Sequence, residues 1–133
     1  GKMAPIFQKK SGGSRWTHKE AEGLLEWQSE GFRATPKVAG FDVDGTIIRT
    51  KSGAPFPKDA NDWQLIQETK LRRALQDLVD SGHCLVFISN QAGIPRKVSV
   101  QGLQQKVQNI QARLGLPIAY LAAYKTNILR KPV

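Results

Sequence analysis

The chain has 133 residues, of which 40% are apolar and 23% charged, a composition typical of one globular domain and short for two. Its 20 Lys and Arg residues outnumber 11 Asp and Glu residues, and the net charge of +9 favours acidic partners, with nucleic acid first. The sequence excludes an internal disulfide, because Cys84 is the only cysteine. No apolar stretch is long enough to span a membrane, so we expect no membrane partner.

Residues 1–36 are predicted to form a basic, largely flexible N-terminal extension. Its first 15 residues include few large apolar side chains that a core could bury. Thr17 and Glu20 have the spacing of a capping box, which predicts a short helix over residues 21–25. Gly31 would stop this helix, and Pro36 then favours an extended chain.

Residues 37–133 are predicted to form one domain in which strands and helices alternate. Short apolar runs predict strands at 37–42, 83–89 and 118–124. Apolar side chains at three- and four-residue spacings predict a helix over 68–81, and a second helix between Ser99 and Gly115. This order predicts a parallel sheet with right-handed crossovers, in a Rossmann-like three-layer α/β/α domain. Ligands of such sheets bind beyond the carboxyl ends of the strands.

Asp42 and Asp44 follow the first predicted strand of this domain, in the segment Phe41-Asp42-Val43-Asp44-Gly45-Thr46. Two carboxylates this close repel each other unless a cation or a shared proton relieves the repulsion. A divalent metal would do so, and it would also neutralise a phosphate. Gly45 permits a tight turn, and Thr46 adds a hydroxyl and an N–H near the phosphate.

This segment closely resembles the first motif of the haloacid dehalogenase superfamily of phosphohydrolases. The resemblance implies that Asp42 is the nucleophile and forms an aspartyl-phosphate. It implies that Asp44 is the general acid and base, and that Asp42 and Asp44 bind Mg²⁺. Ser89, with Asn90 beside it, follows the second strand, where the superfamily has a phosphate-binding Ser or Thr. Lys131 matches the lysine of the third motif, which holds the phosphoryl group electrostatically.

A narrower resemblance covers residues 37–133. The first motif and further segments resemble the phosphatase domain of the polynucleotide kinase 3′-phosphatase family. These segments are Thr50-Lys51-Ser52-Gly53, Phe56-Pro57, Asp62-Trp63, Ser89-Asn90-Gln91-Ala92-Gly93-Ile94, Leu114-Gly115-Leu116-Pro117 and Arg130-Lys131-Pro132. That family removes 3′-phosphates from broken DNA ends. The resemblance therefore implies a role in DNA repair, DNA with 3′-phosphate ends and repair proteins as partners, and a location in the nucleus, with the mitochondrion as the alternative.

DNA also accounts for the basic charge, because its backbone phosphates attract Lys and Arg side chains. We expect Arg96, Lys97 and Arg130 to surround the entrance to the site, with Lys51 as a further candidate. Trp63 can either stack on a base or form part of the core, and the sequence leaves both interpretations open.

Two features depart from the family pattern. The acidic fourth motif that completes the magnesium site lies downstream of the third motif, and Lys131 is followed by only two residues. We therefore expect a fragment of a longer protein, with the C-terminal part of the domain missing and low activity on its own. The sequence also contains no Gly-x-x-x-x-Gly-Lys-Ser/Thr phosphate loop of a kinase.

Two alternative functions stay open from the sequence. The first is a small-molecule phosphatase of the same superfamily, acting on histidinol phosphate or a sugar phosphate, which would leave the basic charge unexplained. The second is a DNA-end-binding module without turnover, consistent with the missing acidic motif.

Overall fold

The computed structural model describes residues 13–91 and 99–124. A five-stranded sheet has the strand order β1-β2-β7-β6-β3, and β4 and β5 form a separate two-stranded sheet. The elements in chain order are β1 (Arg15–Lys19), the 3₁₀ turn η1 (Glu20–Glu22), β2 (Leu24–Gln28), β3 (Lys37–Asp42), β4 (Ile48–Arg49), β5 (Gln64–Leu65), α1 (Glu68–Asp80), β6 (His83–Asn90), α2 (Val100–Leu114) and β7 (Ala119–Ala123).

The alternating elements predicted for residues 37–124 are confirmed. Strands β3, β6 and β7 are parallel neighbours, joined through α1 and α2. The hydroxyl of Ser99 accepts a hydrogen bond from the Gly102 N–H at 2.9 Å, so it caps α2 as expected. Gly115 ends α2 with a φ of 75°, a left-handed conformation that glycine adopts readily. The class of the fold is therefore α/β.

The prediction of a helix over residues 21–25 is wrong, because this segment forms a hairpin that extends the sheet. Strand β1 pairs antiparallel with β2, and β2 pairs antiparallel with β7, so the sheet is mixed rather than parallel throughout. Trp16 stacks on Trp27 with ring centroids 5.3 Å apart, and Leu25 is fully buried. Burial of these apolar side chains outweighs the local capping signal of Thr17 and Glu20.

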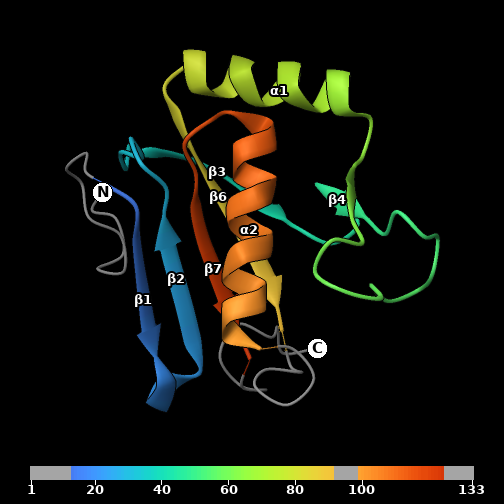
Figure 1. The fold of residues 1–133 in the computed structure, drawn as a ribbon. Helices are drawn as coiled ribbons and strands as arrows, with labels where there is room; N and C mark the ends of the chain where they lie inside the picture. Colours follow the sequence, from blue (N-terminus) through green and yellow to red (C-terminus); the bar gives the residue numbers. More distant parts are fainter. Residues whose placement is uncertain (1–12, 92–98, 125–133) are drawn as a thin grey trace, which may run out of the picture.

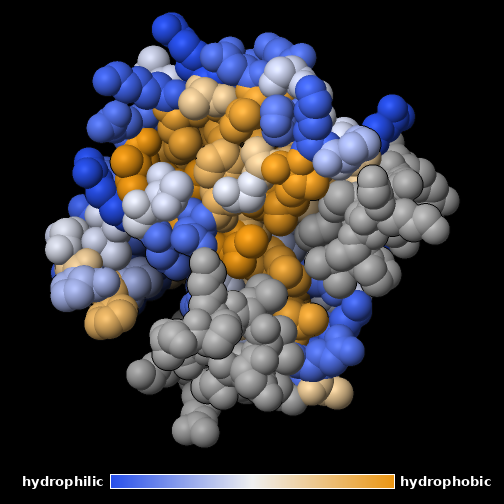
Figure 2. Space-filling view, turned by 180° about the vertical axis from the view of Figure 1, so that it is seen from behind, coloured by the Kyte–Doolittle hydropathy of each residue, from blue (hydrophilic) through white to orange (hydrophobic). Residues whose placement is uncertain are grey.

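Both helices pack on one face of the five-stranded sheet (Figure 1). Leu75 of α1 and Val107 of α2 belong to the same buried cluster as Phe87 and Tyr120 of the sheet. The opposite face carries a smaller apolar cluster around Cys84 and Val86, and apolar side chains gather over it in Figure 2. The described residues thus form two layers, and the third layer stays a prediction. No helix in residues 13–91 and 99–124 is long and apolar enough to cross a membrane.

Substitution of Leu25 tests whether the hairpin belongs to the folded sheet. Leu25 of β2 is fully buried in the cluster that the sheet forms with both helices, so Leu25→Ala should lower the free energy of unfolding by about 2–5 kcal/mol. Val38→Ala is the control, because Val38 is 46% exposed and its truncation should cost less than about 1 kcal/mol. Urea denaturation gives both values. Equal stability of Leu25→Ala and the unmodified chain would contradict the hairpin's place in the core.

Candidate active site

A tight turn directly after β3 positions the two aspartates. The carbonyl oxygen of Val43 accepts hydrogen bonds from the N–H groups of Thr46, Ile47 and Ile48, at 3.4, 2.9 and 3.0 Å. The N–H of Gly45 donates to the carbonyl of Ile48 at 2.8 Å. These bonds close the turn and satisfy its backbone groups internally.

The side chains of this turn divide sharply between the core and the surface. Val43, Ile47 and Ile48 are at most 4% exposed. Asp42, Asp44 and Thr46 are exposed. Gly45 has a φ of 84°, which a residue with a side chain adopts only under strain, although open space surrounds its Cβ position. The apolar anchors therefore hold the backbone, and the polar side chains point away from the core.

Pairing of β3 with β6 brings the second predicted segment to the same edge of the sheet. Asp42 pairs with Ile88, and the Val43 N–H donates to the Ile88 carbonyl at 3.0 Å. Ser89 and Asn90 follow directly on β6. Ser89 is 4% exposed, whereas Asn90 is exposed. The predicted residues Asp42, Asp44, Thr46, Ser89 and Asn90 thus lie at the carboxyl edge of the parallel strands.

Tyr120 is a residue of this region that the sequence analysis missed. It lies on β7 and is fully buried, and its hydroxyl forms no hydrogen bond within the described chain. Burial raises the pKa of Tyr120, the negative charge of Asp44 raises it further, and the nearby Ser89 hydroxyl acts in the opposite direction. A tyrosine within an otherwise apolar strand was the signal available in the sequence. Its hydroxyl is a buried group close enough to Ser89 and Asp44 for both to affect its pKa.

The donor set of the turn is compatible with a magnesium ion. The carboxylates of Asp42 and Asp44 form no hydrogen bond or ion pair with the described residues, so their oxygens are available as ligands. Mg²⁺ prefers oxygen ligands and commonly keeps several waters. Within residues 13–91 and 99–124 no group of three or more His, Cys, Asp or Glu side chains lies together as a metal site. Water or other protein groups would therefore have to complete the coordination.

Four predicted residues lie outside the described ranges. These are the phosphate-binding candidate Lys131 and the DNA-contact candidates Arg96, Lys97 and Arg130. Their roles stay predictions.

Asp62 organises the loop between β4 and β5. Its carboxylate accepts hydrogen bonds from the Ser52 N–H at 2.7 Å, the Ser52 hydroxyl at 2.6 Å and the Lys58 N–H at 3.0 Å. These bonds, led by the one from the Ser52 hydroxyl, lower the pKa of Asp62 from 3.8 to about 2. One carboxylate therefore holds together a loop that has little regular structure. Lys51 precedes Asp62 in this loop, and Trp63 follows it.

Comparison with known proteins identifies close relatives. Residues 37–133 match the family described as polynucleotide kinase 3 phosphatase. The chain is 42% identical over 103 residues to a bifunctional polynucleotide phosphatase/kinase of Schizosaccharomyces pombe, covering 77% of this chain and 25% of the relative. It is 34% identical over 119 residues to an uncharacterized 20.8 kDa protein of Autographa californica nuclear polyhedrosis virus, covering 88% of this chain and 63% of the relative. The chain thus spans less than two-thirds of either relative.

Titration of Asp62 tests the organisation of the loop. Because its pKa is depressed in the folded state, its contribution to stability is present above pH 3.8 and is lost as the pH falls through about 2. We expect an NMR titration of the Asp62 carboxyl to have a midpoint of about 2. Ser52→Ala removes the hydrogen bond that lowers the pKa of Asp62 most, so it should move the midpoint towards 3.8. Ser81→Ala is the control, because Ser81 lies at the C-terminal end of α1, and it should leave the midpoint unchanged. A midpoint near 3.8 in the unmodified chain would refute the arrangement.

Proposed function

The chain belongs to the polynucleotide kinase 3 phosphatase family, and from this premise we propose that it is a DNA 3′-phosphatase acting through an aspartyl-phosphate on Asp42. The observation that carries the proposal is the turn after β3, where buried Val43, Ile47 and Ile48 leave the carboxylates of Asp42 and Asp44 exposed. Both carboxylates lie at the edge of the sheet where α/β proteins bind their ligands.

In the first step Asp42 attacks the phosphorus of the 3′-phosphate in line with the leaving oxygen. A bond forms between the Asp42 carboxylate oxygen and phosphorus, and the bond from phosphorus to the sugar 3′-oxygen breaks. Asp44 gives its proton to that sugar oxygen, so the DNA strand leaves with a 3′-hydroxyl. In the second step Asp44 takes a proton from water as the water attacks phosphorus. The Asp42 carboxylate is released together with inorganic phosphate.

The remaining residues of the site would stabilise the transferring phosphoryl group. Ser89 and Asn90 at the end of β6, and Thr46 in the turn, offer donors at the edge of the sheet that also carries Asp42. Donors fixed in advance by the fold stabilise charge that develops in the transition state. Lys131 would add a positive charge, as the family resemblance implies.

Mg²⁺ is the proposed cofactor, held by the carboxylate of Asp42 and the backbone carbonyl or carboxylate of Asp44. When bound, it supplies positive charge that offsets the repulsion between the Asp42 carboxylate and the phosphate. The free carboxylate oxygens of both residues in the described chain support this assignment.

The charge of the chain supports DNA as the substrate over a small phosphate ester. Three ion pairs connect the described residues, and they involve only Lys19, Arg72 and Arg113 among the basic side chains. The net charge of the whole chain is +9, and a surplus of this size attracts the phosphates of a DNA strand. DNA-repair proteins as partners, and a location in the nucleus or alternatively the mitochondrion, stay predictions.

Asp42→Asn tests the nucleophile. An amide does not form the acyl phosphate, so this substitution in the full chain should abolish magnesium-dependent release of phosphate from a 3′-phosphorylated oligonucleotide. Asp77→Asn makes the same charge change at an exposed position of α1 and should leave turnover unchanged. The measurement is phosphate release, compared with release from histidinol phosphate and sugar phosphates.

Each outcome of this comparison favours one function. Preference for the oligonucleotide supports the DNA 3′-phosphatase. Preference for the small esters favours the small-molecule phosphatase. Salt-dependent DNA binding without any release by the unmodified chain favours a non-catalytic DNA-end-binding module. Retained turnover in Asp42→Asn would exclude the proposed nucleophile.

Ser89→Ala tests the phosphate-binding role of the second strand end. Loss of one preorganised donor to the transition state should lower kcat by about a hundred- to a thousand-fold. Ser81→Ala removes a hydroxyl at the opposite end of the sheet, near the start of β6, and serves as the matched control. Circular dichroism would show that both variants fold. A kcat of Ser89→Ala equal to that of the control would contradict the role.

A further inference from the structure

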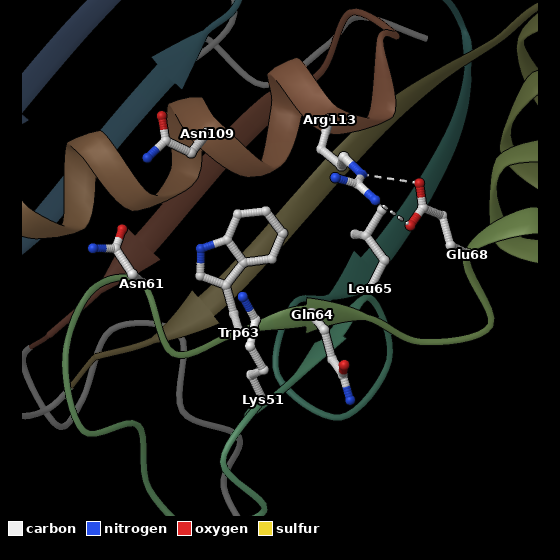
Figure 3. A pocket seen from close by; sticks show the side chains of 8 residues that line it. All are labelled: Lys51, Asn61, Trp63, Gln64, Leu65, Glu68, Asn109 and Arg113. Carbon is white, nitrogen blue, oxygen red and sulfur yellow. Dashed lines mark hydrogen bonds and ion pairs between the residues drawn. The ribbon is translucent and has the colours of Figure 1, made fainter.

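A polar pocket of about 440 Å³ lies on the helix-covered face of the molecule, apart from the aspartate turn. Its walls come from four segments: the loop between β4 and β5, β5 itself, the start of α1, and the exposed side of α2. Figure 3 shows the indole of Trp63 at the centre, with Asn109 and Arg113 of α2 on one side and Lys51 on the other. A volume of this size is within the range of small-ligand sites.

The position of Trp63 is compatible with both roles that the sequence left open. Its side chain is half-buried and packs against the main hydrophobic cluster. The same indole lines the pocket. Packing against the core fixes the orientation of the ring, so it offers a preformed aromatic surface at low entropic cost. Such a surface is what an unstacked nucleobase requires.

The pocket carries excess positive charge. Its one carboxylate, on Glu68, accepts hydrogen bonds at 3.0 Å from both Nε and Nη2 of Arg113, and pairs with Arg72 at 3.1 Å. The bond from Arg113 is the main cause that lowers the pKa of Glu68, so this carboxylate is ionised and already neutralised. Lys51 is exposed and forms no ion pair with the described residues. Its ammonium group is therefore available to a phosphate.

Three amide side chains complete the lining, from Asn61, Gln64 and Asn109. Asn109 accepts a hydrogen bond from Gln105 at 3.0 Å through its oxygen, which leaves its NH₂ group to donate into the pocket. The side chains of Asn61 and Gln64 form no hydrogen bonds with described residues. Amides present donors and acceptors that match the edges of nucleobases.

We propose that this pocket binds one unpaired nucleotide of a single-stranded DNA substrate, with the base on Trp63 and a backbone phosphate on Lys51. A base within a duplex is stacked and would not reach the indole, so the pocket selects a single strand. The proposal rests on the proposed function for the choice of DNA, and it adds a contact outside the reacting phosphate. The loop that carries Lys51 continues from the aspartate turn through β4, so one connection serves both contacts.

Binding of a labelled oligothymidylate with a 3′-hydroxyl end tests the proposal without any need for turnover. In the full chain, Lys51→Ala should weaken binding by about three- to ten-fold and reduce the slope of log affinity against log salt by about 0.7. Lys70→Ala is the matched control, because Lys70 is exposed on α1 and does not line the pocket. Fluorescence anisotropy at several salt concentrations measures both quantities. Equal effects of the two substitutions would overturn the proposal.

Tryptophan fluorescence separates stacking from a purely structural role of Trp63. Trp16 and Trp27 stack on each other at the hairpin, so quenching by the oligothymidylate should come from Trp63. The quenching should disappear in Trp63→Phe, a variant that keeps an aromatic ring for packing. Persistence of the quenching in that variant would overturn the proposal.

Failure of this proposal is distinguishable from failure of the proposed function. If the chain releases phosphate but Lys51→Ala has no specific effect on binding, the proposal for the pocket fails and the proposal of a phosphatase stands. If the oligothymidylate binds through Lys51 and Trp63 but no phosphate is released, the proposal for the pocket stands and the proposal of a phosphatase fails.

Discussion

The carbonyl of Val43 is the point on which the site depends. Three N–H groups converge on this single acceptor, and they bend the chain so that the core receives Val43, Ile47 and Ile48. Without that bend, the alternation of a strand would continue, and the segment after Asp42 would bury every second side chain. The turn keeps Asp42 and Asp44 exposed on either side of buried Val43, as alternation would, and it also buries the consecutive residues Ile47 and Ile48, which alternation would not. Burial of aliphatic side chains therefore supplies the free energy that holds two repelling carboxylates at one edge.

The elements that sequence patterns predicted are those whose signals are local. Leu103, Val107, Ile110 and Leu114 recur at helical spacing, and all four are buried in α2. The hairpin of β1 and β2 escaped prediction because its stabilisation comes from distant parts of the chain. Leu24 to Gln28 pair with β7, and Trp16 meets Tyr120 edge to face. The capping-box pattern of Thr17 and Glu20 is local and carries no information about such partners. It therefore favoured a helix in a segment that tertiary packing makes a strand.

The same distinction explains the prediction of the site. The carboxyl ends of parallel strands share an edge, so topology alone was enough to bring Asp42 and Asp44 to Ser89 and Asn90. No motif identified Tyr120, because its place opposite Phe87, two residues before Ser89 on β6, follows from the register between β6 and β7. The pocket around Trp63 likewise needs α2 to pass beside a loop from another part of the chain. Asn109 and Arg113 look like ordinary exposed residues of a helix until that loop is placed against them.

The layering of the sheet explains why the pocket and the carboxylates occur together. With β3, β6 and β7 adjacent in chain order, right-handed crossovers put α1 and α2 on one face. The connection from β3 to α1 must then cross from the carboxyl edge to that same face. Its first part forms the turn of Asp42 and Asp44, and its later part, held by Asp62, meets the side of α2. The same connection thus builds both the turn that carries Asp42 and Asp44 and one wall of the pocket.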